Sequence, residues 1–329
     1  MSTHIYQTDN QLEQQILSAL AFYDMFDYPL TLLEIWKFLQ TAKGGSGEVT
    51  YSLTEVMMAI DQSLNLEQKI TEKNGFYMLK GREDLWEMRI GRHNVAQRRW
   101  QKLLRLVHWI ADVPFLEMVA ACNMFPLDTP SPASDIDIVI VAKQGRIWLV
   151  RLLVTVLIAL TGQWRHKKVA GKLCLSFFIA DNNLDLQKLY QEKKIWLEPD
   201  PYLVNWVALV APIYDRHRTA AKFPHANNWT KAFIPNNFPY QVVDLRQVKA
   251  GLIAHGWQCF WEWAWGGRAG DKLEAFVRWW QMEYMKSRGD QEWLQNPNVI
   301  RSDEVLKFHE IDRREDFREE FFKKLAGII

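Results

Sequence analysis

The sequence predicts an α+β protein: a small helical unit with a hairpin, then a central mixed sheet covered by helices, then a helical C-terminal region. Three observations support this order. Two capping-box signatures and an Asn-Gly turn stand near the N-terminus, apolar strands alternate with an apolar helix in the middle, and apolar residues recur at helical spacing in the last third. The predicted units are residues 1–83, 84–113, 114–200 and 201–329.

The composition is that of a globular chain without a strong charge bias. The 329 residues include 40 Lys and Arg against 39 Asp and Glu, so the charge balance of the whole chain gives no hint of a nucleic-acid or membrane partner, and any such hint must come from local clustering. Three widely spaced cysteines fit neither a zinc motif nor a disulfide framework, which predicts a reducing cytoplasm. The N-terminus lacks a signal-peptide pattern, and the most apolar run, residues 147–160, is too short for a bilayer. We expect no membrane partner.

The first unit has the pattern of a winged helix, three short helices followed by a hairpin. Thr31 with Glu34 and Ser52 with Glu55 form capping boxes that begin the second and third helices. Asn74-Gly75 favours the two-residue turn of a hairpin. The expected helices lie at residues 12–23, 31–39 and 52–64, and the expected strands at 69–71 and 76–79.

The third helix argues against duplex DNA as a partner. Between Ser52 and Leu64 there is no Lys or Arg, whereas Glu55 and Asp61 are acidic, so this face would repel phosphates. We therefore expect this unit to pack within the protein or to dock another protein.

One long helix, residues 83–112, is expected to link the first unit to the central sheet. Its basic residues are Arg89, Arg92, Arg98, Arg99, Lys102 and Arg105. Two interpretations stay open: a solvated face, or a positive rail that steers a polyphosphate or an acidic acceptor towards the sheet. The helix leads directly into the first strand of the predicted site, and Arg98 and Arg99 are the candidates for steering that we would test first.

The central unit contains a pair of aspartates at the start of an apolar strand. A strand at 115–121 and a polar loop at 123–134 precede the strand 135–141, which begins with Asp135 and Asp137. Because side chains alternate along a strand, both carboxylates point to the same side. Such a pair suffers desolvation and mutual repulsion unless a cation or donors compensate. A divalent cation therefore fits here.

The order strand, polar loop, Ser-Asp-x-Asp strand and helix carrying Arg151 resembles the DNA polymerase β-like nucleotidyltransferase superfamily. The first unit also looks like the N-terminal winged helix of a bacterial subfamily of these proteins. The resemblance implies a nucleotidyltransferase-fold mixed sheet, with Asp135 and Asp137 as catalytic ligands of Mg²⁺ (or Mn²⁺) and a nucleoside triphosphate as the bound nucleotide.

The resemblance also implies further site residues. A Gly-Ser pair of the family opens the loop and holds a nucleotide phosphate, and the matching positions here are Asn123 and Met124, or Cys122 and Asn123 if the loop is one residue shorter. Asn123 tolerates left-handed backbone geometry and offers an amide to phosphate. Ser134 shapes the turn before the aspartates. Arg146 and Arg151 are candidates for phosphate contacts.

The third carboxylate that the family places on a later strand has no clear counterpart. The next strand, 172–179, carries no acid on either face. Asp181 and Asp185 follow it, and each is a candidate metal ligand or a turn and helix-cap residue.

The functional expectation is Mg²⁺-dependent transfer of a nucleoside monophosphate to a hydroxyl group of a protein, an RNA or a small molecule. The alternative is a catalytically impaired nucleotidyltransferase fold that binds nucleotide or docks a protein. A transcription regulator that acts through the winged helix ranks third.

The last unit, 201–329, is expected to be helical. Trp257, Trp261 and Trp265 recur at four-residue spacing and favour core packing or a subunit interface, hence a homo-oligomer, over stacking on a nucleotide base.

Overall fold

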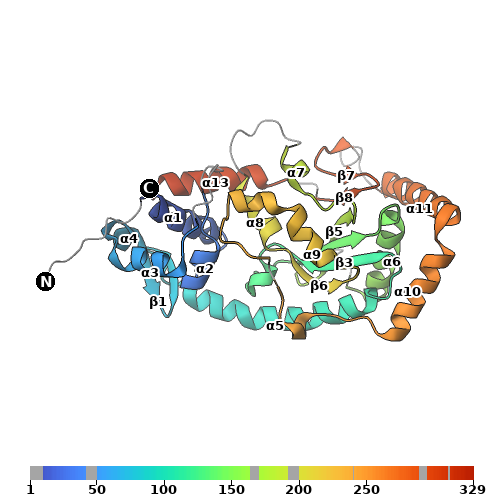
Figure 1. The fold of residues 1–329 in the computed structure, drawn as a ribbon, viewed down its shortest axis with the longest axis horizontal. Coiled ribbons are helices and arrows are strands. Elements are labelled where there is room, and N and C mark those ends of the chain that lie inside the picture. The colour runs from blue at the N-terminus through green and yellow to red at the C-terminus, as the bar shows by residue number, and fades with distance from the viewer. Residues whose placement is uncertain are drawn as a thin grey trace.

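The structure is a computed structural model that describes residues 10–41, 50–163, 170–191, 200–239, 241–288, 295–309 and 312–329. The molecule is elongated, with a helical unit at one end and a sheet flanked by helices towards the other (Figure 1). A mixed α+β architecture is therefore confirmed.

The N-terminal unit forms the three predicted helices and the hairpin, and a further helix that was not predicted, α4 (Leu64–Lys69), lies between them. Both capping boxes are present, with Thr31 and Ser52 each accepting a hydrogen bond from the backbone of the glutamate three residues later. Asn74 and Gly75 adopt φ of 55° and 80° in the hairpin turn. The elements are α1 (Asn10–Asp24), α2 (Leu32–Lys37), α3 (Leu53–Gln62), α4 (Leu64–Lys69), β1 (Ile70–Lys73) and β2 (Phe76–Leu79).

Helix α5 (Leu85–Ile110) runs from this unit to the central sheet, where it packs on one face (Figure 1). Its first arginines pair with the N-terminal unit: Arg89 lies 2.7 Å from Glu34, and Arg92 lies 3.4 Å from Asp27. These two arginines join α5 to the N-terminal unit. They therefore belong neither to a solvated helix face nor to a positive rail that steers ligands towards the sheet.

Six strands form the central mixed sheet, in the order β6-β3-β4-β5-β8-β7. Strands β4 and β5 are parallel and are connected through α6 (Ile147–Leu160); the other neighbouring pairs are antiparallel. The strands are β3 (Leu116–Ala121), β4 (Ile136–Ala142), β5 (Leu173–Ala180), β6 (Ala211–Asp215), β7 (Ile300–Arg301) and β8 (Val305–Lys307).

Helices cover both faces of the sheet. On one face, Ile138 and Ile140 of β4 belong to the core that includes α5, α6 and α11 (Gly267–Arg288). On the other face, Val139 and Val141 pack with α8 (Pro201–Ala208) and α9 (Thr219–Ala226). This alternation follows from the two-residue period of a strand, and it makes β4 a buried central strand as predicted.

The C-terminal region is more than helical. It supplies β6, β7 and β8, strands of two to five residues that are too short to show an alternating pattern in the sequence. Among its described residues this region also contains α10 (Leu252–Ala264) and α13 (Arg314–Ala326). Helix α7 (Gln187–Gln191) lies before the region in the chain. The predicted boundary near 198–201 lies partly outside the described residues, since 192–199 are not described.

Helix α13 returns to the N-terminal end of the molecule and lies beside α1 (Figure 1). Phe321 and Leu325 of α13 belong to the core of the N-terminal unit, together with Leu127 and Leu209. This core therefore draws on segments from all along the chain.

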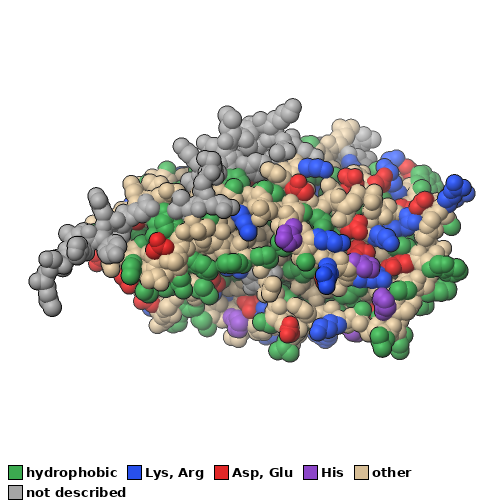
Figure 2. Space-filling view, viewed as in Figure 1, with side chains coloured by type: hydrophobic (Ala, Val, Ile, Leu, Met, Phe, Trp, Pro, Cys, Tyr) green, Lys and Arg blue, Asp and Glu red, His purple; other side chains and the backbone are tan. Residues whose placement is uncertain are grey.

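Helices α10 and α11 expose many aromatic side chains. Trp257 is 54% exposed and Trp263 is 80% exposed, whereas Trp265 packs against the core of the sheet. Hydrophobic side chains lie on the surface at this end of the molecule (Figure 2). The tryptophan stripe is thus only partly core.

Within the described residues, no helix has the length and apolar character needed to cross a membrane.

Candidate functional site

Asp135 and Asp137 lie at the start of β4, which begins at Ile136. Asp137 shares its face with Val139, so it points to the side of the sheet covered by α8 and α9. Both aspartates are half-buried. Two carboxylates at the end of a buried central strand are thus present, as predicted.

Asn123 touches this pair and Met124 does not. The Nδ2 atom of Asn123 donates to Oδ2 of Asp137 over 3.2 Å, and Asn123 has the left-handed φ of 62° that glycine or asparagine favours. Met124 instead packs against the core of the N-terminal unit. Of the two residues matched to the Gly-Ser pair, Asn123 therefore faces Asp137 and Met124 faces away from it.

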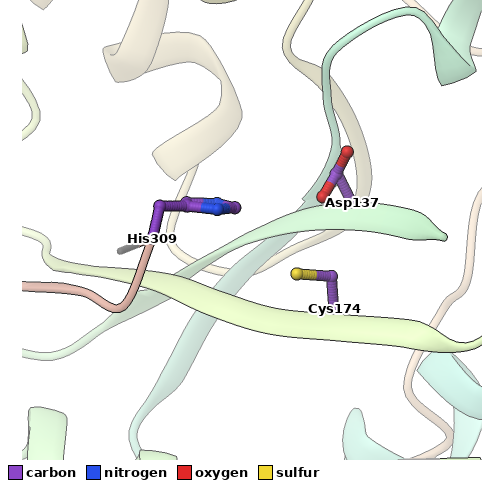
Figure 3. A group of neighbouring side chains, drawn as sticks. All are labelled: Asp137, Cys174 and His309. Atoms are coloured by element: carbon purple, nitrogen blue, oxygen red, sulfur yellow. The ribbon is translucent and has the colours of Figure 1, made fainter. Parts of the chain in front are cut away.

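Strand β5 and the segment after β8 bring two more donor groups to Asp137. Cys174 lies opposite Asp137 in the β4–β5 register, and His309 follows β8 by two residues. The candidate ligand atoms of Asp137, Cys174 and His309 all lie within 4.8 Å of one another. Figure 3 shows the three side chains directed towards a shared space.

The hydroxyl group of Ser176 connects two members of this cluster. Its Oγ lies 2.7 Å from Nε2 of His309, and the thiol of Cys174 donates to it over 3.1 Å. Ser176 thereby holds the imidazole of His309 close to Cys174.

Two buried groups beside the aspartates keep their protons. Burial raises the pKa of the Cys122 thiol well above its usual range, and the charge of Asp137 raises it further. Burial also raises the pKa of Tyr202, at the start of α8, and the charge of Asp137 again adds to the shift. The aspartates therefore face neutral thiol and phenol groups on this side.

The loop before β4 is fixed by Arg99. Its guanidinium donates to the hydroxyl of Ser134 over 3.0 Å and to the carbonyl oxygens of Ser131 and Pro132 over 2.9 and 2.7 Å. Burial lowers the pKa of Arg99, whereas the charge of Asp135 raises it. Arg98, in contrast, is exposed. Arg99 is thus a positioning residue for the loop that carries Ser134, which shapes the turn as predicted.

The structure does not bring Arg146 or Arg151 to the aspartates. Arg146 lies at the other end of β4, where it pairs with Asp271 at 2.9 Å. Arg151 lies on α6, on the opposite face of the sheet, with its guanidinium over the Phe308 ring at 4.5 Å. Burial lowers its pKa to about 10. Both arginines have structural contacts instead of the predicted phosphate role.

Asp181 and Asp185 do not complete the site either. Asp181 follows β5 at the end opposite to Cys174, and its carboxylate accepts from the amide of Gln144 over 2.8 Å. Asp185 accepts from the amide of Gln187 over 2.8 Å at the start of α7. Both are turn or cap residues, which was the alternative left open for them.

Cys174, Ser176 and His309 were missed as site residues. Strand alternation puts Cys174 and Ser176 on one face, but a thiol and a hydroxyl in a strand do not by themselves indicate a metal site. His309 lies 172 residues after Asp137 in the chain, and no neighbouring residue in the sequence indicates a site. Only the pairing of β5 with β8 joins them.

The donors present suit two kinds of cation. The carboxylates of Asp135 and Asp137 are hard oxygen ligands that fit Mg²⁺ or Mn²⁺, whereas a thiol and an imidazole are ligands for softer ions.

No family model, curated protein or solved structure matches this chain.

Proposed function

We propose that the central sheet is a nucleotidyltransferase fold that binds a nucleoside triphosphate with Mg²⁺ at Asp135 and Asp137. The observation that carries this proposal is the pair of half-buried carboxylates at the start of a strand that is covered on both faces. Keeping two acids there for packing alone is costly.

Neighbouring side chains support a preorganised site. Asn123 orients the carboxylate of Asp137 through its hydrogen bond, and Arg99 fixes the loop that leads to Asp135. Mg²⁺ would supply neutralisation of the negative charge on the triphosphate. These residues keep the carboxylates in place before the nucleotide arrives, which lowers the cost of ordering them.

The proposed reaction is transfer of a nucleoside monophosphate to an acceptor hydroxyl of a protein, an RNA or a small molecule. The acceptor oxygen forms a bond to the α-phosphorus and the α–β phosphoanhydride bond breaks. Pyrophosphate leaves with the electron pair of that bond, and the hydroxyl proton passes to water.

A second candidate is a nucleotide-binding or protein-docking module that has lost catalysis. Two observations favour it. Met124 stands where the family has a serine that binds phosphate, and its side chain packs in the neighbouring core. Strand β5 carries Cys174 and Ser176 where the family has an acid.

We further propose that the N-terminal unit is a winged helix with a packing or docking role. Its hairpin follows α4, and the bridge between Leu30 and Tyr77 adds a third strand-like segment. Helix α3 carries no Lys or Arg, so duplex DNA is disfavoured as a ligand.

Calorimetric titration with Mg²⁺-ATP and Mg²⁺-GTP tests the nucleotide site. We expect binding by the natural chain and loss of binding in the Asp135→Asn, Asp137→Asn double variant. Asp181→Asn is the matched control, because it removes a carboxylate at the opposite end of the same strand pair. Absence of binding in the natural chain, or equal binding by the double variant, would contradict the proposal.

Pyrophosphate release separates the two candidates. An enzyme should release pyrophosphate from bound triphosphate when a hydroxyl acceptor is present, and the double variant should not. Nucleotide binding with no pyrophosphate release across protein, RNA and small-molecule acceptors favours the binding module.

A further inference from the structure

Three adjacent strands place the donor groups of Asp137, Cys174 and His309 around one point (Figure 3). Asp137 and Cys174 are register partners on β4 and β5. The amide of Phe308 donates to the carbonyl of Ser176 over 2.9 Å, which fixes the backbone just before His309. The backbone positions of all three residues are therefore set by the sheet and its immediate extension.

The separations suit a metal ion after small side-chain movements. The candidate ligand atoms lie within 4.8 Å of one another, and ligands of a tetrahedral Zn²⁺ at bond lengths of about 2.0–2.3 Å lie roughly 3.3–3.8 Å apart. Side-chain rotations of about 1 Å close that difference. No strand has to shift.

The mixture of donors indicates which ion. A carboxylate oxygen, a thiolate sulfur and an imidazole nitrogen are the three ligand types of protein-bound Zn²⁺, whereas Mg²⁺ selects oxygen ligands alone. We propose that Asp137, Cys174 and His309 form a Zn²⁺ site with one open coordination position.

Burial gives this site a closed side and an open side. Cys174 is buried, Asp137 is half-buried and His309 is exposed, so the ion enters from the solvent beside His309. Three protein ligands leave a fourth position for water or for a phosphate oxygen. Binding displaces the thiol proton of Cys174 into solvent, so the affinity rises with pH.

Ser176 is a positioning residue for this site. Its hydroxyl already holds Nε2 of His309 at 2.7 Å. Coordination through Nδ1 keeps this bond, and coordination through Nε2 replaces it; in both cases the imidazole starts from a fixed orientation.

The Zn²⁺ site shares Asp137 with the proposed nucleotide site but does not rest on nucleotidyl transfer. Asp135 separates the two proposals, because it belongs to the nucleotide site and not to the Zn²⁺ ligands. Asp135→Asn should lose Mg²⁺-nucleotide binding and keep Zn²⁺ binding. Nucleotide binding without Zn²⁺ binding overturns only the metal site, and the reverse result overturns only the proposed function.

Titration of the full chain with Co²⁺, a spectroscopic substitute for Zn²⁺, tests the site directly. The protein is freed of metal and kept under a thiol-free reductant. We expect a sulfur-to-cobalt charge-transfer band at one equivalent, which Zn²⁺ then abolishes. Cys174→Ser should remove the band, and His309→Ala should weaken the Co²⁺ affinity by more than about 100-fold.

Controls address adventitious binding and folding. The Sγ of Cys259 lies 3.6 Å from Nε2 of His255 on the exposed side of α10, so Cys259→Ser removes the exposed thiol and should leave the band unchanged. His309 is exposed, which makes its replacement compatible with folding, and a cooperative thermal transition verifies this. A band that is absent from the natural chain, that persists in Cys174→Ser, or that disappears in Cys259→Ser overturns the proposal.

Discussion

The guanidinium of Arg99 on α5 donates to the hydroxyl of Ser134, one residue before Asp135, over 3.0 Å. The same guanidinium binds two carbonyl oxygens of the loop. Two residues 35 positions apart in the chain, one on a helix and one in a loop, are thereby joined next to the aspartate pair.

Arg99→Ala should weaken Mg²⁺-nucleotide binding by about ten- to a hundredfold, because the loop loses the contacts that position Asp135. Arg98→Ala is the control, since Arg98 is exposed. Titrations at low and high salt distinguish positioning from steering: a positioning effect persists in salt, whereas long-range steering is screened. If both variants lose nucleotide affinity equally, and the losses disappear in high salt, the interpretation of the helix as a positive rail that steers a polyphosphate would be correct instead.

Arg89→Met should lower the free energy of unfolding by about 1–3 kcal/mol, because Glu34, whose side chain is 20% exposed, loses its cationic partner and keeps only the hydrogen bonds from Tyr28 and Thr31. Arg89 donates to both carboxylate oxygens of Glu34, at 2.7 and 2.8 Å, and lies over the ring of Tyr28. Arg89→Lys should also destabilise, since an ammonium group cannot form the paired contacts. Urea unfolding measures both.

Arg105→Ala is the matched control for Arg89. The side chain of Arg105 is exposed and donates to a carbonyl of its own helix, so its loss should change stability by less than about 0.5 kcal/mol. If Arg105→Ala lowers the free energy of unfolding as much as Arg89→Met, the ion pair between Arg89 and Glu34 is not what stabilises the contact between α5 and the N-terminal unit.

Asp128→Ala should lower stability by about 2–4 kcal/mol, because the donor groups of Arg246, Trp100 and Gln97 lose their shared acceptor. Asp128 accepts from Arg246 over 2.8 Å at each oxygen and from the indole of Trp100 over 2.6 Å. A double-mutant cycle with Arg246→Met should give a coupling free energy of about 1–3 kcal/mol. Additive effects of the two single variants would show that the pair is not coupled.

Asp312 should contribute to the pH dependence of stability. Burial raises its pKa, but the hydrogen bond from Arg314 and the charges of Lys307 and Arg314 outweigh burial and hold this pKa well below its usual range. The folded state therefore prefers the ionised carboxylate. Its contribution is present above the unfolded-state pKa of about 4 and is lost as the pH falls further.

Urea midpoints between pH 3 and pH 7 for the natural chain and Asp312→Asn measure this effect. The variant should be less stable by about 2–3 kcal/mol at neutral pH, and the difference should shrink towards pH 3. Asp316→Asn is the control, because Asp316 is largely exposed. A stability difference that stays constant over this range would exclude linkage to the Asp312 carboxyl.

Local signals in the sequence predicted the local structure. The capping boxes at Thr31 and Ser52 and the turn at Asn74-Gly75 each depend on a few neighbouring residues, and each formed where expected. The position of the aspartates at the start of an apolar strand was also predictable, because β4 begins at Ile136, between Asp135 and Asp137. That both carboxylates point to the same side stays a prediction.

The remainder of the site depends on contacts between distant segments. His309 reaches Asp137 only because β8 pairs with β5, and a three-residue strand leaves no alternation to read. Likewise, the partner of Arg89 is a glutamate 55 residues away. The sequence of a basic helix does not show which arginines pair with an acid in a distant segment and which face solvent. Arg89 is of the first kind and Arg98 of the second.

The position of α13 beside α1 affects how the chain matures on the ribosome. Phe321 and Leu325 fill a hydrophobic core whose other members, such as Phe22, are translated about 300 residues earlier. Until residues 314–326 emerge, the nascent chain exposes that apolar surface, and it becomes a target for chaperones or proteases. Removal of the last helix should therefore reduce the yield of intact protein in cells before it affects any chemistry at the sheet.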